Sequence, residues 1–381
     1  MPDTNPATAR AVACEVLNQL DPKRDYASSI LNKLLHRTGE RQRATDLVFG
    51  TLRNRTAIDA VIEKFTTRPI GRIQPKVINI VRIGAYELIF SPAAPDYSIV
   101  NEAVENTKAV AGKKQVGFVN AALRQIARHI SNRQSKLSPS NLRRALPQTT
   151  AAGCEFDTEI LPDPKVSPAE YLSAAFSIPK WLVEDWLGEY GAELAQQICF
   201  ASNRRPSIYI RPNILKTKTA EIAEKFQHAD VDFEVVPLDA PRASSPPQKR
   251  RASIKNQESR MIKIKSPKAV TELPGFEEGE FIVQDISAAW PVRILHPQPG
   301  WRILDLCAAP GTKTTQMAEA TGDKAEIVAT DIDAGRLKML EENATRLGIN
   351  NINIIEYEQL SNNSKSSILN SLCKCAEFRH Q

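Results

Sequence analysis

The chain has 381 residues, of which 42% are hydrophobic and 25% are charged, and its formal net charge is +6. This length and composition indicate a soluble protein of two or three domains and exclude a predominantly disordered chain. No run of 18 apolar residues occurs, so a membrane-spanning helix is not expected, and the N-terminus lacks the basic start and apolar stretch of a secretory signal. We therefore expect a cytoplasmic protein without a membrane partner.

The six cysteines are scattered through a large chain, which indicates reduced thiols rather than a disulfide framework. Cys373 and Cys375 have only His380 nearby, and three such residues are too few ligands for a structural zinc site. The sequence predicts no metal.

From Ala9 to about Ile130 apolar residues recur at the three-and-four spacing of amphipathic helices. Prolines at 75, 92 and 95 and a glycine at 112 stand where breaks between helices belong. The pattern predicts an all-helical domain over residues 1–130. Basic residues coincide with its expected turns and helix ends, where several would reach one RNA backbone: Arg41, Arg43, Arg53, Arg55, Lys113, Lys114, Arg124 and Arg128.

The helical periodicity fails over residues 131–170, which are rich in Pro, Ser and Thr and are predicted to form a linker. Residues 171–283 mix helical patterns with strand-like ones such as SIYIRPN, and this mixture predicts a small α+β module that faces RNA. Its Pro/Ser-rich loop, about 239–260, is expected to be disordered. A basic run from Arg242 to Lys265 overlaps this loop and suits a phosphate backbone. A charge run taken alone is more often a solvated surface loop.

The stretch ILDLCAAPGTKTTQMAE, from Ile303 to Glu319, has the pattern of a strand, a small-residue turn and a helix. A P-loop is excluded because Thr312 separates Gly311 from Lys313, and a dinucleotide fingerprint is excluded because Gly311 is the only glycine of the turn. Two further strand patterns, EIVATD and INIIEYE, flank a helix pattern and indicate a parallel sheet. We predict an incomplete α/β Rossmann-like domain over 284–360, followed by a polar tail over 361–381.

The second strand of this domain ends at Asp331, about twenty residues beyond the turn, where an acidic side chain accepts hydrogen bonds from both hydroxyls of a ribose. A ligand with a ribose but no phosphate at the turn indicates S-adenosylmethionine. Lys313 and the N-terminus of the first helix would then face its methionine carboxylate. We interpret Asp333 as the N-cap of the next helix.

The segments VQDISAAWPVRIL, ILDLCAAPGTKT and IVATDIDAGRL resemble the RNA cytosine-C5 methyltransferases, in particular the bacterial small-subunit ribosomal RNA enzymes of the RsmB (Sun/Fmu) type. In the helical domain, DLVFGTLRNR, RIGAYELIF, IVNEAVE and GFVNAALRQIAR resemble the NusB-type RNA-binding domain that precedes the catalytic domain in that family. The resemblance covers about residues 8–130 and 175–358. It implies a multidomain fold, S-adenosylmethionine as cofactor and small-subunit ribosomal RNA as partner, and no obligatory protein partner is evident.

The same resemblance implies a set of cofactor-binding residues. Asp331 would bind the ribose, Glu358 stands where the family has an Asp that contacts the adenosine, and the turn would wrap the cofactor with Cys307, Ala308, Ala309, Pro310, Gly311, Thr312 and Lys313. Thr312 replaces the usual glycine of the family. For Cys307 we expect a small buried thiol that packs beneath the turn, not a catalytic group.

Members of the family attack carbon-6 of cytosine with a cysteine thiolate, which makes carbon-5 nucleophilic, and a second cysteine assists release. These cysteines lie in D-A/V-P-C-S and T-C-S motifs after the fourth and fifth strands. No Pro-Cys-Ser or Thr-Cys-Ser occurs in the 381 residues. We therefore assign no catalytic residue and expect no methyl transfer by this chain alone, and we interpret it as a shortened reading of a longer gene.

The fold that the resemblance implies places the first strand in the middle of the sheet, so we also expect an unpaired edge and a poorly stable C-terminal segment. One alternative function is a non-enzymatic RNA-binding protein that uses only the helical domain. Another retains the cofactor turn for a different acceptor or for sensing S-adenosylmethionine.

Overall fold

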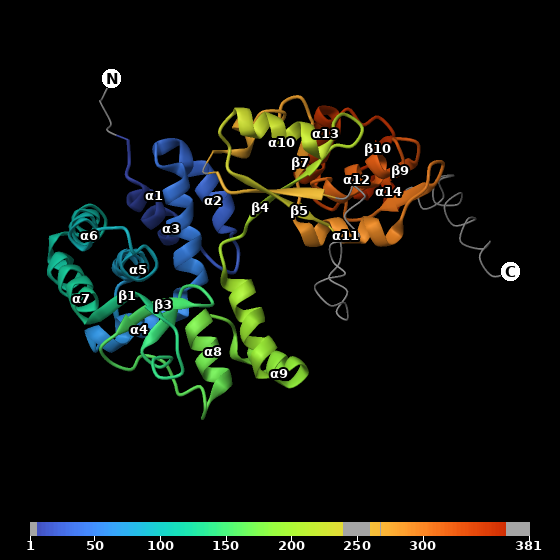
Figure 1. Cartoon of the computed structure of the whole chain (residues 1–381). Coiled ribbons are helices and arrows are strands. Elements are labelled where there is room, and N and C mark those ends of the chain that lie inside the picture. Colours follow the sequence, from blue (N-terminus) through green and yellow to red (C-terminus); the bar gives the residue numbers. More distant parts are fainter. Residues whose placement is uncertain (1–5, 239–259, 267, 363–381) are drawn as a thin grey trace, which may run out of the picture. The chain divides into compact units, whose positions relative to one another are not determined.

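The computed structural model describes residues 6–238, 260–266 and 268–362, which form two compact units, 1–205 and 206–381 (Figure 1). Most of the expected basic loop lies outside the described residues. So does the tail beyond residue 362, with Cys373, Cys375 and His380. None of the described helices is long and apolar enough to cross a membrane.

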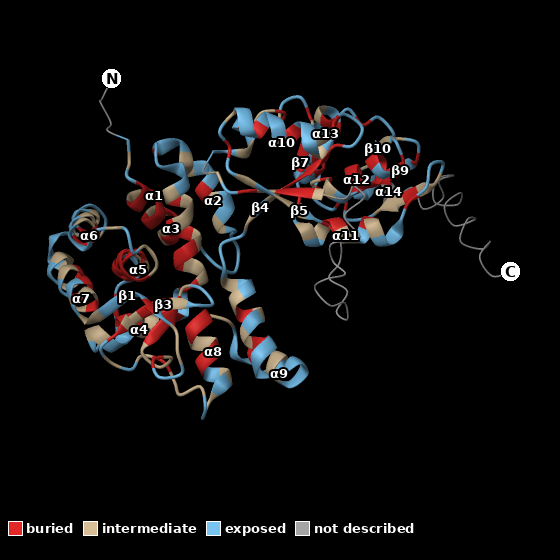
Figure 2. Cartoon of the chain, viewed as in Figure 1, coloured by how far each residue is buried: buried red, intermediate tan, exposed pale blue. Residues whose placement is uncertain are grey.

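The first unit begins with a helical region, as the apolar spacing predicts. Its helices are α1 (Ala9–Gln19), α2 (Ala27–Leu34), α3 (Arg41–Arg53), α4 (Arg55–Thr66), α5 (Pro75–Phe90), α6 (Asp96–Val110) and α7 (Val116–His129), with short 3-10 turns at Leu35–Arg37, Ile70–Arg72 and Lys113–Gln115. Helix α5 is buried along most of its length, from Val77 to Ile89 (Figure 2). Pro75 starts this helix at a position where its fixed φ suits the first turn and its missing N–H leaves no bond unmade.

Residues 131–170 differ from the predicted linker, because they form an antiparallel sheet that packs on the helices. Strands β1 (Ile130–Lys136), β2 (Ala145–Pro147) and β3 (Ala152–Phe156) lie in the order β1-β3-β2. Leu146, Cys154 and Phe156 are fully buried in the same core as the helices. Most of the Pro, Ser and Thr residues that suggested a linker lie in the turns between these strands and in the segment between β3 and the next helix. Strands this short leave only a weak alternation in the sequence.

Helices α8 (Pro168–Phe176) and α9 (Lys180–Asn203) also differ from the expected domain division. The sequence placed them largely in the α+β module, but Tyr171, Phe176 and Cys199 are buried in the core of the first unit. Helix α9 is kinked at Gly191, whose φ of 75° is outside the helical region. The first unit therefore extends to Arg205.

The second unit contains two sheets. The antiparallel sheet has the order β5-β6-β4-β7 and is formed by β4 (Ile208–Pro212), β5 (Phe233–Pro237), β6 (Arg260–Ile264) and β7 (Phe281–Val283). Helix α10 (Thr219–His228) covers it and contributes Ile222 and Phe226 to the core around Ile210, Ile262 and Phe281. The α+β character that the sequence predicts for this region is confirmed.

The other sheet is parallel, with the order β10-β9-β8 for β8 (Arg302–Asp305), β9 (Glu326–Ala329) and β10 (Ile352–Ile354). Ile327 of β9 lies opposite both Ile303 and Ile352. Helices α11 (Ile286–Leu295), α12 (Thr312–Ala320), α13 (Ala334–Leu347) and α14 (Tyr357–Asn362) alternate with these strands. Within the described residues β8 pairs only with β9, so its other edge has no strand partner there.

Candidate cofactor site

The parallel strands bring the predicted turn and Asp331 together. Strand β8 ends at Asp305 and leads into the turn, while β9 ends at Ala329 and leads to Asp331. Two hydrogen bonds continue the ladder beyond the strands: the Thr330 amide donates to the Asp305 carbonyl at 2.9 Å, and the Ala308 amide donates to the Thr330 carbonyl at 3.0 Å. The two loops therefore start side by side at the carboxyl edge of the sheet, where open α/β sheets bind ligands.

Gly311 closes the turn and caps α12. Its amide donates to the Ala308 carbonyl at 2.7 Å, and its φ of 99° lies in the region that favours glycine. A Cβ atom at this position would lie 2.9 Å from Cγ of Leu340 in α13. Thr312 follows as the first helical residue and is not among the residues with positive φ, so a β-branched side chain is tolerated there.

The carboxylate of Asp331 is buried, with 7% of the residue exposed, and backbone amides fix its orientation. The Ala309 amide donates to Oδ2 at 3.1 Å, and the Asp333 amide donates to Oδ1 at 3.1 Å. An ionised carboxylate has about four acceptor positions, so each oxygen retains capacity for a further donor. This arrangement suits a diol ligand that approaches the edge of the sheet.

Helix α13 holds the turn from its other side. Arg336 donates from Nη2 to the Ala309 carbonyl at 2.8 Å, and Asn343 donates from Nδ2 to the Pro310 carbonyl at 3.0 Å. The side chain of Asp333 accepts from the Arg336 amide at 3.0 Å, which confirms its predicted role as N-cap. Arg336 and Asn343 were not identified from the sequence. Their spacing of seven residues, which places both on one helix face, was the available signal.

Beneath the turn, polar side chains fix the first turns of α12. Thr314 donates from Oγ1 to Oδ2 of Asp305 at 2.8 Å. Arg211, in β4, donates to Oγ1 of Thr315 at 3.2 Å and forms an ion pair with the buried Glu319. Burial raises the pKa of Glu319, and the Arg211 guanidinium opposes that shift. None of these supporting residues was predicted as part of the site.

The exposed side chains of the turn differ from one expectation. Cys307 is exposed and does not pack beneath the turn, because the small side chains of Ala308 and Ala309 occupy the buried positions there. Lys313 is exposed in the first turn of α12. Two apolar side chains of the same loops, Leu306 and Ile332, are 53% and 87% exposed, and the sequence analysis did not single them out.

Glu358 is the one predicted site residue that follows the third strand of the parallel sheet. It is exposed in the first turn of α14, which follows β10. Because β10 is parallel to β9, this position lies at the same edge of the sheet as Asp331. Hydrogen bonds and chain continuity thus bring residues 307–313 and Asp331 together, and the parallel strand order places Glu358 at the same edge.

The donors and acceptors at this edge fit a nucleoside that carries a carboxylate. Helix α12 has no side-chain cap and no acidic residue in its first turn, so its amide groups suit an anion. The carboxylate of Asp331 suits ribose hydroxyls, and the exposed Leu306 and Ile332 suit the faces of a base. No group of His, Cys, Asp and Glu residues within the described part of the chain is arranged to hold a metal ion.

Comparison with known proteins assigns the parts of the chain. Residues 7–128 match the NusB family, residues 178–241 match the ferredoxin-like domain of RsmF/B-like methyltransferases, and residues 292–370 match the 16S rRNA methyltransferase RsmB/F family. A solved structure described as the crystal structure of PH0851 has the same fold, with a TM-score of 0.59 and 21% identity over 92% of this chain and 69% of that one.

Two curated relatives are similar over nearly the whole chain. The probable ribosomal RNA small subunit methyltransferase B of Synechocystis sp. is 31% identical over 92% of this chain and 69% of that protein. The ribosomal RNA small subunit methyltransferase B of Yersinia pseudotuberculosis is 30% identical over 90% of this chain and 68% of that protein. The chain thus spans about two thirds of the length of these relatives, and it belongs to the RsmB/F family of 16S rRNA methyltransferases.

Proposed function

We propose that this chain serves the methylation of cytosine at carbon-5 in small-subunit ribosomal RNA, with S-adenosylmethionine as methyl donor, in the cytoplasm. The observation that carries the proposal is the buried carboxylate of Asp331, held at 3.1 Å from the amide of Ala309 in the turn CAAPGTK. The carboxylate of Asp331 then accepts hydrogen bonds from both the turn backbone and a ribose hydroxyl, so it fixes the ligand relative to the turn.

The residues of the site have separate tasks in this proposal. Asp331 accepts hydrogen bonds from the ribose hydroxyls, and residues 307–313 follow the cofactor along the edge of the sheet. Lys313 and the N-terminus of α12 face the methionine carboxylate. Leu306 and Ile332 cover the adenine, and Glu358 contacts the adenosine from the first turn of α14.

When bound, S-adenosylmethionine supplies an electrophilic methyl group, but carbon-5 of cytosine becomes nucleophilic only after a thiolate adds to carbon-6. The 381 residues contain neither of the cysteine motifs that the family uses for this step. Cys307 is exposed but lies within the cofactor turn, and no base is hydrogen-bonded to it among the described residues. We therefore propose that this chain binds cofactor and RNA without transferring a methyl group by itself.

Calorimetry with S-adenosylmethionine tests the cofactor site in the full chain. Asp331→Asn removes the negative charge while keeping the shape, and we expect binding to weaken at least about tenfold, which corresponds to the loss of one charged hydrogen bond. Glu341→Gln, an exposed change on α13, is the matched control and should bind like the original chain. Equal binding by Asp331→Asn and the control would contradict the assignment.

Transfer of tritiated methyl groups to unmodified small-subunit ribosomal RNA tests the predicted inactivity. We expect no incorporation above a reaction without protein. Incorporation into cytosine would overturn the proposal that this chain lacks a nucleophile.

A second candidate function is RNA binding without any role for the cofactor. It is favoured by the first unit, whose continuous core runs from Ala9 to Cys199 and whose surface is basic. RNA binding without measurable S-adenosylmethionine binding would support it over the methyltransferase proposal.

A further inference from the structure

The first unit contains a cavity of about 790 Å³ that neither the sequence analysis nor the cofactor site accounts for. Five parts of the unit line it: the end of α3, the C-terminal half of α5, the turn between β2 and β3, the last residue of α8 and the end of α9. We call it the aromatic–arginine groove, after the lining residues Arg53, Tyr86, Phe90, Phe200, Arg204 and Arg205.

The groove is positively charged, because its lining contains the arginines Arg53, Arg204 and Arg205 but no acidic residue. Arg205 reaches Asp46 at 3.1 Å, whereas the guanidinium groups of Arg53 and Arg204 make no hydrogen bond or ion pair within the described residues. Partial burial lowers the pKa of Arg53, and the nearby charge of Asp46 opposes this shift without reversing it.

The rings of the groove are held in fixed positions. Tyr86 and Phe90 are stacked with centroids 5.4 Å apart, and Phe200 packs edge-on against the buried Phe176 at 4.6 Å. Tyr86 lies directly on the backbone of α3, because a Cβ atom at Gly50 would be 2.1 Å from its Cζ atom. Such preset rings lose little conformational entropy when a ligand stacks on them.

Polar side chains brace the same walls. Asn203 donates to Oδ1 of Asn54 at 2.9 Å, and Asn54 donates to the Gly50 carbonyl at 2.9 Å, which ties the end of α9 to α3. Gln148 donates to the carbonyl of Ile89 and so ties the β2–β3 turn to α5. The groove is therefore a built feature of the unit.

The groove continues beyond the first cavity. Arg53, Tyr86, Phe90 and Arg205 also line an adjacent cavity of about 840 Å³ between α3 and the end of α5, whose wall, unlike that of the first cavity, includes the acidic residues Asp46 and Glu87. Two cavities that share a wall of rings and guanidinium groups offer space for more than one nucleotide.

We infer that the aromatic–arginine groove binds a single-stranded segment of RNA, with bases stacked on Tyr86, Phe90 and Phe200 and phosphates at Arg53 and Arg204. Aromatic rings recognise the faces of unpaired bases, and unpaired guanidinium groups recognise phosphates. A stacked duplex does not expose its base faces, so the rings favour a single strand. The inference rests on the proposed function, which makes ribosomal RNA the partner, and adds where and in which form that RNA is held.

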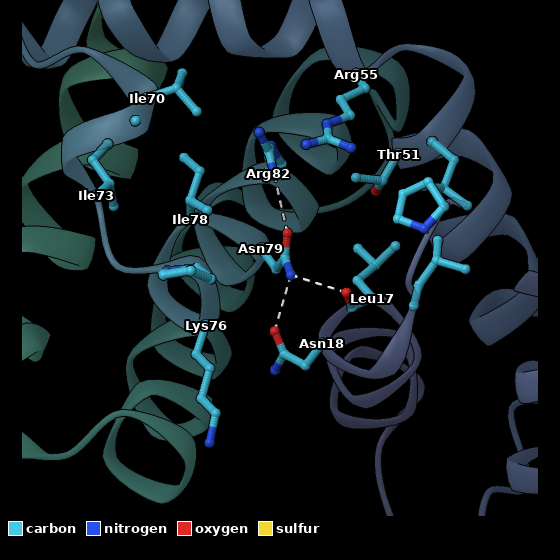
Figure 3. A pocket seen from close by; sticks show the side chains of 15 residues that line it. Leu17, Asn18, Thr51, Arg55, Ile70, Ile73, Lys76, Ile78, Asn79 and Arg82 are labelled. Carbon is cyan, nitrogen blue, oxygen red and sulfur yellow. Dashed lines mark hydrogen bonds between the residues drawn. The ribbon is translucent and has the colours of Figure 1, made fainter. Parts of the chain in front are cut away.

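Another cavity of the same unit supplies a control. It has a volume of about 510 Å³ and carries the cations Arg55, Lys76 and Arg82, but no aromatic side chain lines it (Figure 3). Arg82 is paired with Asp59: its Nε donates to Oδ1 at 2.7 Å and its Nη2 donates to Oδ2 at 2.8 Å. Removing cations here changes the net charge as much as removing them from the groove, without touching a ring.

The test is fluorescence anisotropy of the full chain with a labelled single-stranded RNA of about ten nucleotides, at two salt concentrations. We expect Arg53→Gln/Arg204→Gln to weaken binding about tenfold or more and to reduce the salt dependence. Tyr86→Leu should weaken binding about five- to tenfold with the salt dependence unchanged, because the variant loses the stacking of one base and keeps every cation. Tyr86→Phe should bind like the original chain, and a hairpin duplex should bind more weakly than the single strand.

The control is Arg72→Gln/Lys76→Gln, which removes two exposed cations, one lining this second cavity and one in the turn beside it. For this variant we expect less than about a twofold effect, the size of a nonspecific charge contribution. An equal loss in the control and the groove variant, or no loss in the groove variants, overturns the inference while leaving the proposed function intact. If the unchanged chain binds S-adenosylmethionine but no RNA, the RNA part of the proposed function fails as well. If circular dichroism shows that Tyr86→Leu is unfolded, the comparison of Arg53→Gln/Arg204→Gln with the control still decides the outcome.

Discussion

Arg211 of β4 and Glu319 of α12 form a buried ion pair, with side chains 8% and 2% exposed. The sequence placed these two residues in different domains, an α+β module and a cofactor domain. Arg211 also donates to Gln284 and Thr315, so the pair is embedded in a network that joins the two sheets of the second unit. The helix that follows the cofactor turn is thereby anchored to the antiparallel sheet.

This pair yields a stability prediction. Arg211→Met leaves the Glu319 carboxylate buried without its partner, and we expect the second unit to lose about 3–5 kcal/mol of unfolding free energy. The double variant Arg211→Met/Glu319→Leu should recover most of the loss. Hydrogen exchange of α12 peptides at increasing urea measures it, and Arg302→Met, which removes a more exposed pair with Glu326, should cost less than about 1 kcal/mol. Similar losses in both arginine variants would contradict the prediction.

A second prediction concerns two glycines with positive φ in the second unit. A Cβ atom at Gly279 would lie 1.8 Å from the carbonyl oxygen of Arg346, whereas one at Gly300 would have no atom within 4 Å. Their φ angles are 67° and 82°, so alanine meets comparable backbone strain at both positions, about 1–2 kcal/mol. We expect Gly300→Ala to fold with roughly this penalty and Gly279→Ala to be far less stable, as thermal unfolding would show. Equal melting temperatures would contradict the close contact.

A third prediction distinguishes the thiols. Burial raises the pKa of Cys14 and Cys199 to about 11 and that of Cys154 to about 12, whereas Cys307 is exposed. In the folded chain, iodoacetamide at pH 8 should label Cys307 quickly and the three buried thiols Cys14, Cys154 and Cys199 slowly, because the thiolate is the reactive form. Mass mapping of labelled peptides measures the rates, with guanidinium-unfolded chain as the control. S-adenosylmethionine should slow labelling of Cys307, and unchanged labelling would speak against a ligand at the turn.

A fourth prediction follows from Glu155 in β3. Hydrogen bonds from Ser135 and Asn141 and the nearby Arg144 lower the pKa of this carboxyl. A folded-state pKa below the unfolded one stabilises the fold above about pH 4.3, the unfolded value, and this contribution is lost as pH falls through the folded pKa. The protection factors of amides in β1 and β3, which are corrected for the slower intrinsic exchange at low pH, should therefore fall between about pH 5 and pH 3. Glu155→Gln should flatten this dependence, whereas Glu159→Gln, which removes an exposed partner of Arg143, should not.

The sequence was most informative where local chemistry dictates the backbone. Gly311 is required by a positive φ, Asp333 caps a helix, and Asp331 lies two residues beyond the end of β9. Each can be identified from its neighbours along the chain. The sheet formed by β1, β2 and β3 was missed because β2 and β3 have only three and five residues, and because only one of the seven residues of β1 is buried. Arg336 and Arg211 were missed for a different reason: their partners, Ala309 and Glu319, are distant in sequence, and no local pattern encodes such pairs.

The contact between Gly50 and Tyr86 has a consequence for how this surface can vary between relatives. The ring occupies the volume that any side chain at position 50 would need. A change from glycine at 50 is therefore compatible only with a smaller residue at 86, so the two positions should change together. Relatives that carry a larger residue at 50 are expected to lack the ring, and with it one of the stacking faces that an unpaired nucleotide would use.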